Sequence, residues 1–169
     1  MFELPWGRPA QWLEINETIA YMIKRYQRDL PQAFALAAQT ENLLESVFPL
    51  MDELCAASCS DCREACCRVA KLWYNFPDLL FLHLNGLEPA PGQPHREYHL
   101  HCRYLSGQGC MLPRIRRPWI CTWYLCPSQT SLLRKKGKTV RRRVDEIFQE
   151  IKEKRKGMEE EFLRVICQF

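Results

Sequence analysis

Apolar residues recur every three or four positions over residues 11–50, which is the spacing of one face of a helix. Pro31 divides this region, because proline suits the first turn of a helix, and Pro49 is expected to end the second helix. The pattern therefore predicts a helical hairpin over 11–50, with a first helix at 11–30. Its repeating apolar positions are Trp12, Ile15, Ile19, Met22 (or Ile23), Tyr26, Phe34, Ala37, Ala38, Leu44, Val47 and Phe48.

Two further helices are predicted nearer the C-terminus. The apolar run at 77–84 has the length of a short helix, and Gly86 supplies a C-terminal cap. The segment 139–168 carries an apolar stripe at helical spacing, and Thr139 is expected to cap its N-terminus. Members of the stripe are Val140, Val144, Ile147, Ile151, Met158, Phe162 and Val165.

The chain between these helices has a different character. A loop rich in turn residues is followed by YHLHCRYLSGQGCML, 98–112, which predicts a short hairpin, and by RRPWICTWYLCP, 116–127, which is irregular and aromatic. We therefore expect one mainly α domain over 1–169. In it a helical bundle-like scaffold encloses a small, irregular, cysteine-rich lobe within 55–126.

Ten cysteines set this chain apart from an ordinary 169-residue domain, and five of them fall in CAASCSDCREACC, 55–67. The N-terminus lacks the basic stretch and apolar run of a signal peptide, and no apolar stretch approaches the ~18 residues that span a bilayer. A cytoplasmic location without membrane contact is therefore expected. Clustered cysteines in that compartment bind metal more often than they form disulfides, so the cysteine-rich lobe is predicted to be metal-binding.

Eight of the cysteines fall into four close pairs. Zinc and Cu(I) take a shell of thiolates, and an iron–sulfur cluster takes four at its corners, so eight make two sets, or one set and a group with another role. The adjacent Cys66 and Cys67 point in different directions on any regular backbone, which favours a polynuclear site or two neighbouring sites. The pairs are Cys59 and Cys62, Cys66 and Cys67, Cys102 and Cys110, and Cys121 and Cys126.

Other side chains are candidate substitutes for these ligands. His99 and His101 alternate just before Cys102, and either can replace a thiolate or donate a hydrogen bond to one; surface histidines on a hairpin are the simpler interpretation. Cys55 lies outside the pairs. It is followed by three cysteines at successive intervals of four, three and four residues, and a helix would place all four on one face. That face would hold Cys55, Cys59, Cys62 and Cys66.

The cysteine pattern resembles that of the bacterial YkgJ-like, or CxxCxxCC, family, whose members are described as zinc- or iron-chelating domains. The resemblance covers 59–126, and one extra residue between the second and third cysteines departs from it, as does a longer stretch after Cys110. Pro113 and Thr122 also stand where the family has tyrosine and arginine. Matching residues between the cysteines are Leu105, Gly109, Arg117, Pro118 and Tyr124.

The resemblance implies a ligand set and a general role. Family members are often labelled iron–sulfur proteins, and flagellin lysine methylases carry a similar domain, which implies electron transfer, sensing or an accessory role in a modification reaction. Arg117 and Tyr124 would lie beside the cofactor. The implied metal ligands are Cys59, Cys62, Cys66, Cys67, Cys102, Cys110, Cys121 and Cys126.

The residues favour an iron–sulfur cluster, of the [4Fe–4S] type, over zinc. Zinc knuckles usually place a glycine just after a C-x2-C pair, and CSDCREACC contains none. Arg114, Arg116 and Arg117 can offset the charge of such a cluster and raise its reduction potential, although surface salt bridges are an equal alternative for them. Zinc is the main alternative metal, and Cu(I) storage would not require the segment around Pro118.

The basic run RKKGKTVRRR, 134–143, could attract an acidic partner or nucleic acid, but a solvated helix face is the simpler interpretation. The chain has no Gly-rich phosphate loop, nucleophile elbow or dinucleotide fingerprint, so enzymatic activity is left open. Three hypotheses follow. The first is a small iron–sulfur protein with an unidentified protein partner or electron donor. The second is a zinc-stabilised module that interacts with protein or nucleic acid. The third is a cluster-dependent enzyme.

Overall fold

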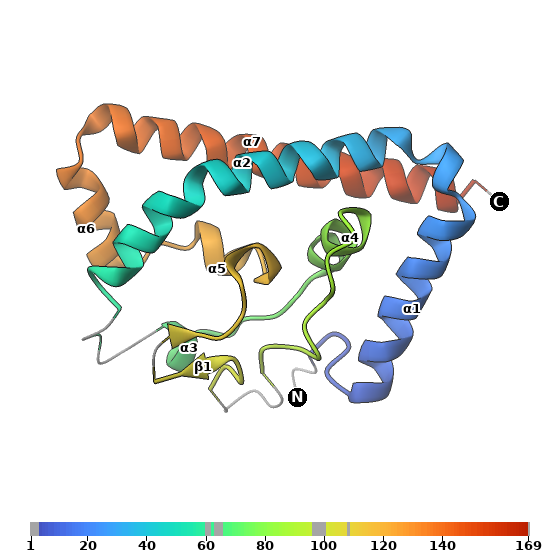
Figure 1. The fold of residues 1–169 in the computed structure, drawn as a ribbon, viewed down its shortest axis with the longest axis horizontal. Coiled ribbons are helices and arrows are strands. Elements are labelled where there is room, and N and C mark those ends of the chain that lie inside the picture. Colours follow the sequence, from blue (N-terminus) through green and yellow to red (C-terminus); the bar gives the residue numbers. More distant parts are fainter. Residues whose placement is uncertain (1–3, 60–61, 63–65, 96–100, 108, 169) are drawn as a thin grey trace.

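The computed structural model describes residues 4–59, 62, 66–95, 101–107 and 109–168. The chain is mainly helical, as predicted (Figure 1). Its long helices are α1 (Pro9–Arg25), α2 (Pro31–Ala56) and α7 (Lys138–Ile166), and its shorter ones are α3 (Cys66–Val69), α4 (Phe76–Leu84), α5 (Ile120–Trp123) and α6 (Pro127–Lys135). Two 3-10 turns, η1 (Gln27–Asp29) and η2 (Arg114–Arg116), and the strands β1 (Leu105–Ser106) and β2 (Gly109–Cys110) complete the described elements.

The two longest helices, α2 and α7, lie side by side in opposite directions and form one edge of the molecule (Figure 1). At one end of this pair α1 turns away, and at the other end α6 returns the chain to α7. α4 packs against α1, α2 and α7, while α3, α5 and the β1–β2 hairpin occupy the remaining side. We call α1, α2, α4 and α7 the helical frame, and the described parts of 57–75 and 101–126 the cysteine lobe.

The core of the frame follows the periodic apolar positions. The predicted stripe of α7 is buried from Val144 onward and meets an apolar face of α2, whereas Val140 is 36% exposed. Each fully buried aliphatic side chain contributes roughly 1.5–3 kcal/mol, so this seam is the main source of the frame's stability. On α2 the buried apolar residues are Ala33, Ala37, Leu44, Val47, Met51 and Leu54.

The predicted end of the second helix at Pro49 is wrong, because α2 continues to Ala56. Proline inside a helix costs about 3 kcal/mol. The turns after it bury Met51 and Leu54, which are 2% and 1% exposed, and burying each contributes roughly 1.5–3 kcal/mol. Tertiary packing thus outweighs the local break.

This longer α2 also corrects the prediction of a helical cysteine face. Cys55 is the penultimate residue of α2, Cys59 lies in the turn after it, and Cys66 begins the separate short helix α3. The cysteines therefore do not form a single-helix stripe.

The first helix and the predicted hairpin also differ from expectation. α1 ends at Arg25, earlier than the predicted 11–30, and the 3-10 turn η1 follows it. The chain then turns so that α1 packs on α4 rather than along α2. A buried hydrogen bond from Trp12 Nε1 to the carbonyl of Ala90, 3.0 Å long, fixes α1 to the loop that follows α4.

The caps of the later helices were partly predicted. Gly86 follows α4 with a φ of 65°, the left-handed conformation expected of a C-terminal glycine. Thr139 is not the N-cap of α7, because Gly137, with a φ of 99°, starts the helix two residues earlier. The β-hairpin predicted within 98–112 is confirmed: β1 and β2 pair, with Leu105 opposite Cys110.

Candidate metal centre

Nine of the ten thiols, all except Cys167, gather in two groups at the junction of frame and lobe. All ten cysteines are free. One group, here called the hairpin group, surrounds the β1–β2 hairpin and consists of Cys67, Cys102, Cys110 and Cys121. The other, the helix-end group, lies where α2 ends and α6 begins and consists of Cys55, Cys59, Cys62, Cys66 and Cys126.

The backbone positions the hairpin group from three segments. The Cys102 N–H donates to the Cys67 carbonyl at 2.9 Å, which joins α3 to the chain before β1. β2 carries Cys110, and the single turn of α5 carries Cys121. Short elements with few internal hydrogen bonds thus hold four thiols near one another.

Burial and mutual repulsion act on these thiols. Burial raises the pKa of Cys67 to about 11, with further contributions from the charges of Cys102 and Cys110. The pKa of Cys121 is raised further, first by burial and then by Cys67, Cys110 and Cys102. Such thiols do not ionise at neutral pH without a compensating positive charge.

Cys126 occupies a favourable place for a thiolate in the helix-end group. It is the N-cap of α6, where its side chain faces the first free backbone N–H groups of the helix. The partial positive charge at a helix N-terminus stabilises a thiolate. Burial, followed by the charge of Cys126, raises the pKa of Cys66, so these two thiols from distant parts of the chain are neighbours.

The adjacent Cys66 and Cys67 belong to different groups. Cys66 interacts with Cys126, Cys62 and Cys55, whereas the strongest thiol neighbours of Cys67 are Cys102 and Cys110. This is the divergence that the sequence favoured for the doublet.

Neither group is a finished coordination shell. Within the described residues, no three His, Cys, Asp or Glu side chains come together closely enough to hold a single metal ion. The eight-cysteine ligand set therefore stays a prediction. Binding would require the sulfur atoms to adjust around an incoming metal or cluster.

The arginines divide between the groups. The charge of Arg117 lowers the pKa of Cys67 against the larger effect of burial, so Arg117 lies beside the hairpin group; its predicted role beside a cofactor stays a prediction. Arg114 Nη2 approaches Cys55 Sγ at 3.5 Å. Arg116 instead donates to the Pro89 carbonyl at 3.1 Å. Tyr124, the other residue predicted beside a cofactor, is 45% exposed and packs edge-on against Trp123.

The histidines are less central than the thiols. His101 is exposed, and its Nδ1 shares a 3.0 Å hydrogen bond with the carbonyl of Arg68. An open groove of about 430 Å³ beside it is lined by Arg68, His101, Cys102, Leu105, Ser106 and Gly107. His99 lies outside the described residues.

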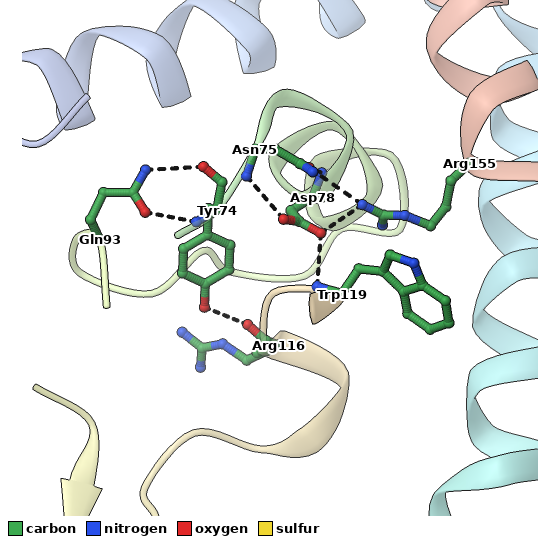
Figure 2. A network of polar contacts seen from close by, with 7 residues as sticks. All are labelled: Tyr74, Asn75, Asp78, Gln93, Arg116, Trp119 and Arg155. Carbon is green, nitrogen blue, oxygen red and sulfur yellow. Dashed lines mark hydrogen bonds and ion pairs between the residues drawn. The ribbon is translucent and has the colours of Figure 1, made fainter. Parts of the chain in front are cut away.

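A buried polar network, which sequence reasoning missed, joins the frame to the lobe (Figure 2). Asp78 Oδ1 accepts from Arg155 Nη2 of α7 at 2.6 Å and from the backbone N–H of Trp119 at 2.9 Å. Its other carboxylate oxygen accepts from the backbone N–H of Asn75 and caps α4. One carboxylate thus holds α4, α7 and the residue that begins the turn carrying Cys121.

The sequence contained a signal for this network. Asp78 is the one acidic residue in the run FPDLLFLHL, and it stands three residues after Asn75, as in a capping box. Arg155 lies four residues after Ile151 and three before Met158, which places it on the buried stripe of α7. Arg155 stands in the charged run KEKRK, 152–156, yet its side chain is 7% exposed.

The basic segment 134–143 is partly neutralised within the chain. Lys136 pairs with Glu53 of α2 at 2.5 Å, and Arg142 pairs with Glu146 one turn later at 3.4 Å. Arg141 pairs with Asp145 in the same way. These contacts support the interpretation of a solvated helix face.

No family model, curated protein or solved structure matches this chain. The YkgJ-like resemblance therefore rests on the residues quoted for it. In the described part of the chain, no helix combines the length and the apolar character needed to cross a membrane.

Proposed function

We propose that the protein binds metal through its clustered thiols, as an iron–sulfur protein with a [4Fe–4S] centre. The centre would serve electron transfer, sensing or an accessory role in a modification reaction. The observation that carries the proposal is the hairpin group, in which four thiols from three separate segments are neighbours. Four thiolates are the usual complement of such a cluster.

The energetics of the hairpin group support a metal. Burial and mutual repulsion raise the pKa values of Cys67 and Cys121, so four thiols here would be costly to ionise alone. A bound metal supplies the missing positive charge, and its binding free energy then becomes folding free energy. Arg117 would compensate part of the remaining negative charge.

The sequence around the first cysteines favours a cluster over a zinc ion. Zinc knuckles usually place a glycine just after a C-x2-C pair, and CSDCREACC contains none. With either metal the sulfur atoms would have to move together, because the described cysteines form no group of three that could hold an ion.

Metal analysis of protein purified without oxygen tests the proposal. We expect iron and acid-labile sulfide in similar amounts, with a visible absorbance that bleaches on reduction. The double variant Cys121→Ser, Cys126→Ser should lower both the metal content and the yield of folded protein, whereas Cys167→Ser, at an exposed position, should change neither. Colourless protein with stoichiometric zinc and no sulfide would refute the iron–sulfur assignment, and full metal content in the double variant would refute the ligand set.

A further inference from the structure

Cys55 is the one member of the two thiol groups that lies outside the family-like pattern, and its surroundings are built around its sulfur. Arg114 Nη2 lies 3.5 Å from Cys55 Sγ and Gln129 Nε2 lies 3.4 Å from it. Arg114 is also fixed by Asp52, which lies one helical turn before Cys55 in α2: Arg114 Nε donates to Asp52 Oδ1 at 2.7 Å. Two hydrogen-bond donors from distant segments therefore converge on one thiol.

Gln129 connects Cys55 with two other members of the helix-end group. Its Nε2 also approaches Cys59 Sγ at 3.7 Å, and its Oε1 accepts from the backbone N–H of Cys126 at 3.3 Å. The residue is 7% exposed. A buried amide with both ends committed in this way fixes the relative positions of three cysteines.

The position of Cys55 near the C-terminus of α2 makes hydrogen-bond donors important for a thiolate there. Cys55 is in the last turn of α2, and the partial negative charge of a helix C-terminus disfavours an anion there. The guanidinium of Arg114 offsets that effect. The hydrogen bond from Arg114 Nε to Asp52 holds this guanidinium beside Cys55.

We propose that Cys55 is a metal ligand, and that with other cysteines of the helix-end group it holds a second thiolate-bound centre, separate from that of the hairpin group. This inference rests on the proposed metal-binding function. Cys66 and Cys67 have different thiol neighbours, so each belongs to a different centre. Gln129 and Arg114 are positioning residues that donate hydrogen bonds to the ligand sulfurs, an arrangement that raises the reduction potential of an iron–sulfur centre.

The extra residue between Cys62 and Cys66 suggests why the helix-end group contains a fifth cysteine, Cys55. The sequence has three residues between Cys62 and Cys66, where the family-like spacing has two. Cys55, anchored on a long helix, provides a replacement whose position does not depend on the inserted residue.

The test compares Cys55→Ser with Cys121→Ser and with the exposed control Cys167→Ser, each purified without oxygen and analysed for iron and sulfide. If the two centres are alike, Cys55→Ser and Cys121→Ser should each keep about half of the metal of the original protein, while Cys167→Ser keeps all of it. Full metal content in Cys55→Ser, or a total that fits a single centre in the original protein, would overturn the inference. An original protein without bound metal would refute the proposed function itself.

A second variant covers the case in which Cys55→Ser fails to fold. Gln129→Leu removes both donated hydrogen bonds but keeps a side chain of similar size. We expect it to retain metal while one of two reduction potentials in a redox titration shifts to a lower value. Unchanged potentials in Gln129→Leu would overturn the inference, because a purely structural amide would alter stability and not the potential.

Discussion

The helical frame and the cysteine lobe are stabilised in different ways. The frame buries a continuous apolar seam between α2 and α7, so many small contributions of the same kind support it. The lobe has short elements of two to four residues. Its buried Tyr74, Tyr104 and Leu112 share the core of the frame, and single polar groups such as the Asp78 carboxylate join its backbone to the frame. The regular seam tolerates a local fault such as Pro49, whereas the loss of a buried charged partner leaves the other charge uncompensated.

Breaking the shared attachment should have the largest effect. Asp78→Ala leaves the buried Arg155 without its carboxylate partner, so we expect the free energy of unfolding to fall by about 3–5 kcal/mol. It also frees the backbone N–H of Trp119, so bound metal should be lost from the lobe. Urea unfolding and metal analysis measure the two effects.

Two controls sharpen this prediction. Asp145→Ala removes an exposed carboxylate that pairs with Arg141 and should cost at most about 1 kcal/mol. Adding Arg155→Met to Asp78→Ala should recover part of the lost stability, because the buried charge is removed. If Asp78→Ala behaved like Asp145→Ala, the network would not join frame and lobe.

A variant that creates a cavity in the frame should lower the stability of the frame without changing the metal content of the lobe. Ile151 is fully buried in the seam, so Ile151→Ala should lower the free energy of unfolding by about 2–5 kcal/mol. Metal content per folded chain should be unchanged, since the thiol groups are untouched. The exposed Leu163 offers the matched control, Leu163→Ala. Metal loss in folded Ile151→Ala protein would show that the regions are not independent.

The smallest effect concerns the dependence of the frame on pH. Burial lowers the pKa of His83, whose Nε2 donates to Asn16 Oδ1 at 2.9 Å. Between the folded and unfolded pKa values the unfolded chain binds more protons, so stability falls as the pH drops below about 6.5. Urea unfolding from pH 7 to pH 5 should show a shallower loss in His83→Gln. An identical loss in both proteins would assign it to other groups.

The contrast also explains what the sequence could predict. Periodic apolar residues placed α4 and α7 closely and identified the buried stripe, because burial on one helix face requires that spacing. Cysteine spacing and the Cys66–Cys67 doublet indicated two sets of thiols. The roles of Gln129 and Asp78 could not be predicted, because each depends on partners from other segments. The predicted helix end at Pro49 was wrong for a related reason. The helix continues because Met51 and Leu54 pack in the core, and that packing depends on other segments.

The hydrogen bond from the Trp119 amide to Asp78 has a consequence for hydrogen exchange. This amide belongs to a short irregular segment, where protons normally exchange through small local openings. Its acceptor, however, is held by α4 and α7, so exchange requires the frame to separate there. The Trp119 proton should therefore exchange as slowly as the central amides of α7, and its exchange rate would report whether lobe and frame unfold as one cooperative unit.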